Sequence, residues 1–78
     1  MAKSKQAIRV AIADDHPIFR DGLRKLLEAE EDMVVAGEAS NGAEAVQMIP
    51  KVKPDVLLLD LRMPDKDGLT VLEEVNFD

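Results

Sequence analysis

Three carboxylates stand directly after two short apolar segments of the chain. Asp60 follows Val56-Leu57-Leu58-Leu59, and Asp14 and Asp15 follow Val10-Ala11-Ile12-Ala13. If these segments are neighbouring parallel strands, their carboxyl ends meet at one edge of a sheet and bring the three acids together. Carboxylate oxygens are the ligands that a hard divalent cation prefers, and a cation there would attract an anion. The spacing therefore predicts a site for a divalent cation and an anionic ligand such as a phosphoryl group.

These carboxylates need a scaffold, and the apolar pattern of the chain predicts one of alternating strands and helices. Strands are expected at 8–13, 33–36 and 56–59, because each is a short apolar segment. The strands are apolar throughout, which is typical of a parallel sheet with helices on both faces. Right-handed crossovers are expected between them. We therefore predict an α/β fold in which the first and third strands are neighbours.

Three helices are predicted after these strands. The first begins at Pro17, whose missing N–H suits the first helical position. The second is expected to be capped by Asn41 with Glu44 and to have its end bracketed by Pro50 and Pro54. The third follows Asp67-Gly68. The residues expected on their apolar faces are Phe19, Leu23, Leu26 and Leu27, then Ala45, Val46 and Ile49, then Leu69, Leu72 and either Val71 or Val75.

The composition restricts the class of protein and its partners. At 78 residues, with 46% hydrophobic and 33% charged residues, the chain makes at most one small globular domain. A net charge of −6 argues against nucleic acid or an anionic membrane as the partner of this segment. The chain has no cysteine and no apolar run near the ~20 residues that span a bilayer, so we expect a soluble, cytoplasmic protein. Residues 1–7 are predicted to be a flexible N-terminus.

Three stretches of the sequence resemble the receiver domain of two-component response regulators, most closely the NarL/FixJ type. They are Ala13-Asp14-Asp15-His16-Pro17-Ile18-Phe19-Arg20-Asp21-Gly22-Leu23, Val35-Ala36-Gly37-Glu38-Ala39-Ser40-Asn41-Gly42 and Asp55-Val56-Leu57-Leu58-Leu59-Asp60-Leu61-Arg62-Met63-Pro64-Asp65-Lys66-Asp67-Gly68. The resemblance runs from about Ile8 to Val75. It implies a flavodoxin-like (CheY-like) parallel sheet with helices on both faces and the strand order 2-1-3.

By position, the resemblance implies that Asp60 is a phosphoacceptor and that Mg²⁺ is the cofactor. Asp15 and Asp60 would ligate the ion directly, Asp14 would help through water, and Arg62 would offer its backbone carbonyl. The residues that would shape the loop holding this carbonyl are Met63, Pro64 and Gly68. The chemistry suits these residue types, because Mg²⁺ favours octahedral oxygen coordination and phosphoryl transfer depends on positioning and charge stabilisation.

The resemblance implies a partner and a role as well. A histidine kinase would donate the phosphoryl group, in a two-component pathway that regulates transcription. Kinases of this kind dock on the first helix of a receiver, so Ile18 and Phe19 are candidate contacts. The protein would not be an enzyme, since any phosphoryl transfer would be to itself.

The resemblance also implies parts that this sequence does not contain. Residues 8–78 correspond to three of the family's five strand–helix units and are expected to be a partial, truncated receiver domain. The fourth strand with its Ser or Thr, the fifth with its switch aromatic and Lys, and a DNA-binding domain would be absent. We therefore expect the strand at 56–59 to present an unpaired edge through which the protein self-associates.

Alternatives remain open at this point. A receiver half could be a non-catalytic assembly module that associates with itself and uses no phosphoryl chemistry. An aspartate-nucleophile phosphohydrolase would commonly carry a second acid where this chain has Arg62, so it is disfavoured. His16 is interpreted as a helix-start residue rather than a ligand, and Asp65 and Asp67 as turn and cap residues.

Overall fold

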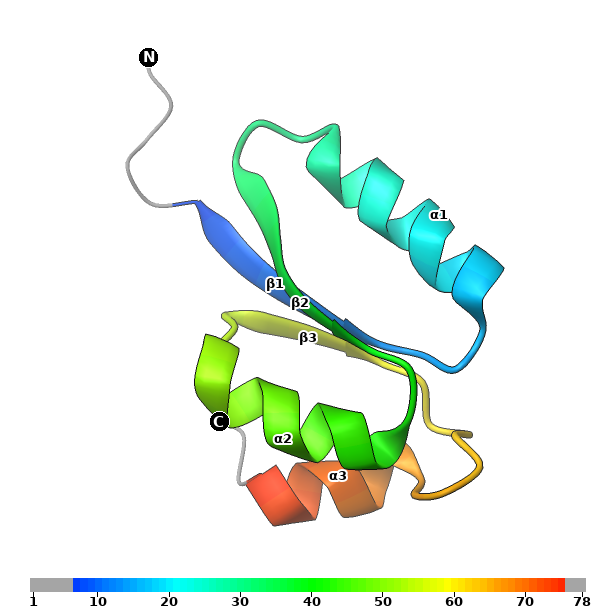
Figure 1. Cartoon of the computed structure of the whole chain (residues 1–78). Coiled ribbons are helices and arrows are strands. Elements are labelled where there is room, and N and C mark those ends of the chain that lie inside the picture. Colours follow the sequence, from blue (N-terminus) through cyan, green and yellow to red (C-terminus); the bar gives the residue numbers. More distant parts are fainter. Residues whose placement is uncertain (1–6, 76–78) are drawn as a thin grey trace.

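The computed structural model describes residues 7–75, which form three strands and three helices in alternation. The elements are β1 (Ile8–Ala13), α1 (Pro17–Glu28), β2 (Met33–Ala39), α2 (Gly42–Val52), β3 (Val56–Leu59) and α3 (Gly68–Val75), as Figure 1 shows. Of the segment 1–7 predicted to be flexible, all but Ala7 lies outside the described residues. The element order is the one that the apolar pattern predicts.

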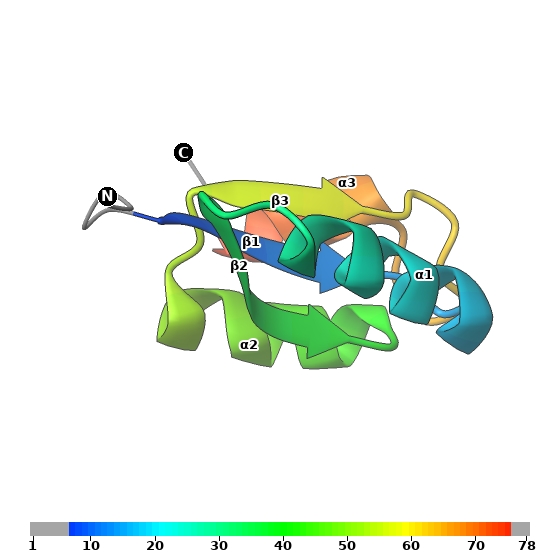
Figure 2. The same ribbon diagram turned by 90° about the horizontal axis from the view of Figure 1, so that it is seen from above.

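The three strands form one parallel sheet with β1 in the middle. The order is β2-β1-β3, which confirms the predicted order 2-1-3 and the pairing of the first and third strands. All three arrows point the same way in Figure 2. Ala13, the last residue of β1, pairs with Ala39 of β2 and with Leu59 of β3. The three strands therefore end level with one another, and the residues after β1 and β3 start from the same edge.

Strand β2 is longer than predicted. The predicted strand 33–36 continues to Ala39, because the register shifts at Ala36, where Val10 pairs with Val35 and Ala11 pairs with Gly37. A glycine in a strand often marks such a bulge or a close approach of another element. Here α2 is the close neighbour, since a methyl group on Gly37 would lie 2.9 Å from the Met48 sulfur. The prediction ended the strand too early because the apolar segment stops at Ala36, before Gly37 and Glu38.

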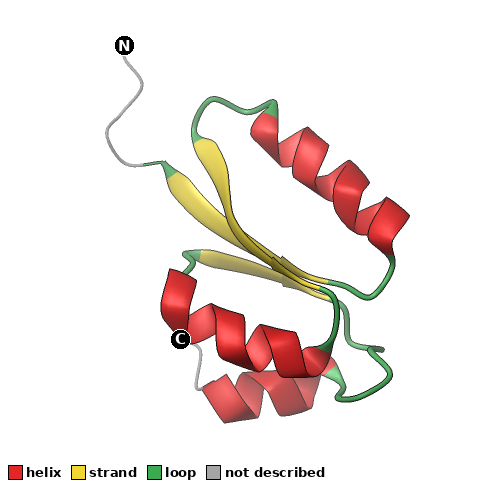
Figure 3. Ribbon diagram, viewed as in Figure 1, coloured by secondary structure: helices red, strands yellow, loops and turns green. Residues whose placement is uncertain are grey.

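The helices cover the two faces of the sheet unequally. Helix α1 lies alone on one face, and α2 and α3 lie side by side on the other (Figures 1 and 3). Helix α1 begins at Pro17 as predicted, but its apolar stripe is only half covered. Leu23 and Leu27 are half-buried, whereas the side chains of Phe19 and Leu26 are 59% and 69% exposed. The prediction of a core-facing stripe is therefore wrong for Phe19 and Leu26.

Helix α2 confirms both its predicted cap and its predicted end. Asn41 accepts the backbone N–H of Glu44 at 2.8 Å, and the Glu44 carboxylate accepts both the N–H and the hydroxyl of Ser40. The helix ends at Val52, between Pro50 in its last turn and Pro54, as the two prolines predict. The following residue, Lys53, has the left-handed φ of 50° that often closes a helix.

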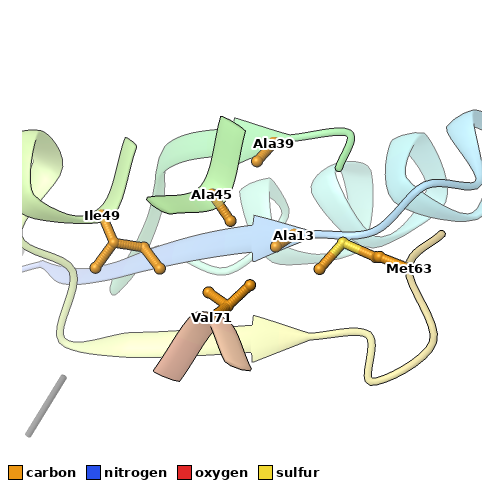
Figure 4. Close-up of a cluster of buried hydrophobic side chains, with 6 residues drawn as sticks. All are labelled: Ala13, Ala39, Ala45, Ile49, Met63 and Val71. Atoms are coloured by element: carbon orange, nitrogen blue, oxygen red, sulfur yellow. The ribbon is translucent and has the colours of Figure 1, made fainter. Parts of the chain in front are cut away.

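The buried core lies between the sheet and the pair α2 and α3. Figure 4 shows its six side chains, which are Ala13, Ala39, Ala45, Ile49, Met63 and Val71. Of the two alternatives for α3, Val71 is the fully buried residue, Val75 is partly buried, and Leu69 is 64% exposed. Within residues 7–75, no helix is long and apolar enough to cross a membrane. Met63 thus anchors the loop between β3 and α3 to the same core that supports the sheet.

Candidate functional site

The acids after β1 and β3 are fixed by the hydrogen-bond ladder of the sheet. The Asp14 N–H donates to the Ala39 carbonyl at 3.0 Å, and the Asp60 N–H donates to the Ala13 carbonyl at 2.9 Å. Both backbones thus continue the sheet by one residue, so the register of the strands sets the position of both acids. The carboxylates of Asp14, Asp15 and Asp60 and the His16 ring offer four ligand atoms within 4.8 Å of one another. The structure therefore brings together the three acids that the sequence predicts to converge.

The three carboxylates differ in burial and in partners. The Asp14 side chain is 9% exposed, and its Oδ1 accepts the His16 backbone N–H at 2.8 Å. The Asp60 side chain is 19% exposed, and its Oδ1 accepts the Arg62 N–H at 2.9 Å. The Asp15 Oδ1 is shielded from solvent and accepts no hydrogen bond. The His16 Nδ1 lies 3.0 Å from it, but the hydrogen bond of that nitrogen is directed at Asp14.

His16 joins this cluster. Its Nδ1 lies 3.0 Å from Asp14 Oδ1 and 3.8 Å from Asp60 Oδ2, while most of the ring faces solvent. The hydrogen bond to Asp14, followed by the charge of Asp15, raises the pKa of His16 above its usual value. The residue does lie at the start of α1, as predicted; it occupies the N-cap position, but its side chain caps nothing. Sequence reasoning missed its place among the acids, although a residue between Asp15 and a helix-starting Pro17 has little freedom to lie elsewhere.

The loop after Asp60 holds the other predicted site positions. The side chain of Arg62 is exposed, Met63 is buried and Pro64 is exposed. At Gly68, a methyl group would lie 2.5 Å from Leu61 Cδ2 and 3.2 Å from the Asp60 carbonyl oxygen. The loop therefore passes close to the first turn of α3, and a side chain at residue 68 would crowd the backbone of Asp60 and Leu61.

Asp65 attaches this loop to α2. Its carboxylate accepts the backbone N–H groups of Gly42 at 2.8 Å and Ala43 at 2.9 Å, at the positive end of the helix. These two bonds, the Gly42 bond first, hold the pKa of Asp65 below its usual value. Sequence reasoning predicted only a local turn role, because nothing local connects residue 65 to residue 42. Asp67 does cap α3 as predicted, accepting the Thr70 N–H at 2.9 Å.

Acid is expected to weaken the attachment of this loop. The backbone bond from Thr70 lowers the pKa of Asp67 as the Gly42 bond lowers that of Asp65. A lowered native pKa gives stability that is complete above the unfolded value, here 3.8 for aspartate, and is lost as the pH falls through the native value. Urea unfolding midpoints should therefore decrease across this acid range. The Asp65→Asn variant should show a shallower decrease, and an unchanged pH profile would contradict the role of Asp65.

Arg20 of α1 links the backbone that follows β1 to strand β2. Its Nη1 donates to the Asp14 carbonyl at 2.6 Å, and its Nε donates to Glu38 of β2 at 3.3 Å. The sequence places Arg20 simply on the polar face of the first helix. Its contacts instead hold the backbone of Asp14 between α1 and β2.

The donor set fits a hard divalent cation. Three carboxylates close together, one with a shielded oxygen that accepts no hydrogen bond, leave negative charge that a cation would neutralise. Mg²⁺ is commonly held by one or two carboxylates together with waters and phosphate oxygens. Asp14, Asp15 and Asp60 present such oxygens at the carboxyl ends of β1 and β3.

A parallel sheet of order 2-1-3, with helices on both faces and an acidic site at the strand ends, places the protein in the flavodoxin-like class of α/β folds. The chain belongs to the response regulator receiver domain family, whose sequence model matches residues 10–77. The class thus follows from the fold and the site, and the family follows from the match.

Curated relatives support the family assignment. The nitrate/nitrite response regulator protein NarL of Escherichia coli K12 is 36% identical over 72 residues, covering 92% of this chain and 33% of NarL. The transcriptional regulatory protein YvfU of Bacillus subtilis is 47% identical over 68 residues, covering 87% of this chain and 34% of YvfU. The chain thus spans about a third of the length of these relatives.

Solved receiver structures share the fold. The receiver domain of a putative NarL from Mycobacterium tuberculosis is 44% identical with a TM-score of 0.85, covering 91% of this chain and 57% of that one. CheY of Borrelia burgdorferi, in a complex with CheX, BeF3 and Mg²⁺, is 29% identical with a TM-score of 0.82, covering 94% and 56%. The chain therefore spans somewhat more than half of each of these structures.

Proposed function

We propose that this chain is the phosphoacceptor of a two-component pathway, with Asp60 as the residue that receives the phosphoryl group. The observation that carries the proposal is the convergence of Asp60 with Asp14 and Asp15 at the ends of neighbouring strands. In this proposal Asp15 and Asp60 hold Mg²⁺ directly, Asp14 helps through water, and Arg62 adds its carbonyl oxygen. Met63, Pro64 and Gly68 keep that carbonyl in position.

The reaction uses the free oxygen of Asp60. Its Oδ1 accepts the Arg62 N–H, which leaves Oδ2 to form the new bond to phosphorus. The bond between phosphorus and the histidine nitrogen of the kinase breaks, its electron pair stays on that nitrogen, and the nitrogen takes a proton from solvent. Bound Mg²⁺ would supply positive charge against the phosphoryl oxygens. The strand ladder holds the carboxylates where this charge is needed, so positioning is the contribution of the fold.

The comparisons support this proposal and its setting. The Borrelia CheY structure contains Mg²⁺ and BeF3, and the curated relatives are named response regulators or transcriptional regulatory proteins. We propose accordingly that a histidine kinase is the donor, that the protein acts in the cytoplasm, and that transcription is regulated. Ile18 and Phe19 of α1 are 89% and 59% exposed and are available as kinase contacts.

Removal of metal tests the proposed chemistry. Incubation with Mg²⁺ and a small phosphodonor such as acetyl phosphate should add the mass of one phosphoryl group, since the cation offsets the charge of three carboxylates. The adduct should be absent when EDTA replaces Mg²⁺. Intact-mass spectrometry measures it, and circular dichroism confirms that the protein remains folded with EDTA. An adduct of equal yield in EDTA would contradict the proposed role of the cation.

A second candidate function, self-association, is favoured by the outer edge of β3. Within residues 7–75, β3 pairs with β1 only, so its other edge offers free backbone groups. Beside this edge, on the α1 face, lies a groove of about 570 Å³. Its lining residues are Ile12, Asp14, His16, Phe19, Leu23, Leu58, Leu59, Asp60 and Leu61. We propose that a second copy pairs here.

The oligomeric state tests this second candidate. Sedimentation velocity should show a dimer that dissociates on dilution, and Leu58→Lys should shift it toward monomer because a charge would enter the groove. The control is Val34→Lys, at a position on the far strand of the sheet that is already 40% exposed. A wild-type monomer at all concentrations would contradict the proposal.

A further inference from the structure

We propose that His16 is a fourth side-chain ligand of the cation site formed by Asp14, Asp15 and Asp60. Its imidazole would make this site selective for first-row transition cations such as Zn²⁺ over Mg²⁺. The proposal rests on the cation site proposed above for Asp14, Asp15 and Asp60. It adds that the site is not purely an oxygen site, because an imidazole nitrogen reaches it from the start of α1.

The distances between donor atoms support this assignment. Two ligands of one cation, each about 2.1 Å from it and at right angles, stand about 3 Å apart. The His16 Nδ1 lies 3.0 Å from Asp14 Oδ1 and 3.0 Å from Asp15 Oδ1. Its distance of 3.8 Å to Asp60 Oδ2 is within the range spanned by ligands at wider angles. One cation could therefore contact the nitrogen and the carboxylates without a large movement of the backbone.

The local structure keeps the backbone of His16 beside the acids and leaves the ring free to turn. The His16 backbone N–H donates to Asp14 Oδ1, and Pro17 follows as the first residue of α1. Because the ring is 69% exposed and makes no cap bond, turning it toward a cation would break no contact with the core. His16 lines the same groove as Asp14 and Asp60.

The chemistry of the donor set predicts the selectivity. Imidazole nitrogen is a good ligand for Zn²⁺, Co²⁺ and Ni²⁺, whereas Mg²⁺ favours oxygen and keeps much of its water. An imidazole ligand should therefore add affinity for Zn²⁺, Co²⁺ and Ni²⁺ and little for Mg²⁺. The chain has one histidine and no cysteine, so a bound transition cation with an imidazole ligand can only have used His16.

The experiment compares cation binding by the tag-free wild-type chain and by His16→Asn, which retains a residue suited to the N-cap. Calorimetric titrations with Zn²⁺ and with Mg²⁺ are made at mildly alkaline pH, where imidazole is neutral. Zn²⁺ affinity should fall by at least about tenfold in the variant. Mg²⁺ affinity should change by less than about twofold. In the wild type, Zn²⁺ should shift the ¹⁵N resonance of the one imidazole Nδ1, which a merely structural residue would not show.

Other outcomes would overturn the proposal in recognisable ways. Equal Zn²⁺ affinities in the two proteins, or an unshifted Nδ1 resonance at Zn²⁺ saturation, would show that His16 is not a ligand. A rise in Mg²⁺ affinity with unchanged Zn²⁺ affinity would show that the ring competes with the cation. If Mg²⁺ binds and supports the phosphoryl adduct in such cases, the proposed function stands and only the role of His16 fails. If neither cation binds the wild type, both proposals fail together.

Discussion

Asp60→Asn is expected to abolish the phosphoryl adduct completely and to leave the fold intact. An amide oxygen is not a nucleophile toward phosphorus, so no residual yield is expected from this position. The fold should persist because the backbone N–H of residue 60 still donates to Ala13, and the amide oxygen of asparagine can still accept the Arg62 N–H. Intact-mass spectrometry after incubation with Mg²⁺ and acetyl phosphate measures the adduct, and circular dichroism measures the fold.

Asp67→Asn is the matched control for this experiment. Asp67 lies on the same loop and caps α3, but it is not among the clustered ligands. Asparagine is as good an N-cap as aspartate, so the control should keep both its fold and its adduct. An adduct that survives Asp60→Asn would mean that another residue accepts the phosphoryl group. Loss of the adduct in both variants would mean that the loop, rather than the Asp60 carboxylate, limits the reaction.

Met63→Ala is expected to destabilise the protein by about 2–5 kcal/mol, as for other buried methionines replaced by alanine. Met63 is 5% exposed and packs in the cluster that joins the β3–α3 loop to the sheet (Figure 4). Small domains have total stabilities of roughly 5–15 kcal/mol, so this loss would leave a large unfolded population. Urea unfolding followed by circular dichroism gives the change in the free energy of unfolding.

Leu69→Ala is the control for the packing prediction. Leu69 is apolar and close in sequence to Met63, but its side chain is 64% exposed. Its replacement should change the free energy of unfolding by less than about 0.5 kcal/mol. If both variants lost the same amount, the burial of Met63 would not explain its effect.

The parts of the fold that depend on local pattern could be predicted from the sequence. The bounds of β1 and β3 match the apolar segments, and α1 begins at Pro17, because a short apolar segment and a proline each restrict the backbone locally. Strand β2 extends past its predicted end, since Gly37 is compatible with a turn or with a bulge, and only the neighbouring helix distinguishes the two. The end of α2 at Val52 was predictable, because Pro50 and Pro54 flank it and a proline disfavours continuation of a helix.

The candidate site could be predicted only as far as strand topology determines it. Asp14 and Asp60 converge because parallel neighbouring strands end at the same edge, and the apolar pattern is sufficient for that inference. The place of His16 depends on side-chain direction, and that of Asp65 on a contact across 23 residues, neither of which a sequence pattern contains. The exposure of Phe19 could not be predicted either, because periodicity identifies an apolar face but not what covers it.

The attachment of Asp65 to α2 makes the opening of the β3–α3 loop measurable by amide exchange. The amides of Gly42 and Ala43 are at the start of a helix, where no earlier carbonyl in the helix can protect them from exchange with solvent. Their hydrogen-bond acceptor is a carboxylate on the β3–α3 loop. Hydrogen–deuterium exchange at these two amides therefore measures how often that loop opens, at a distance from the acids themselves.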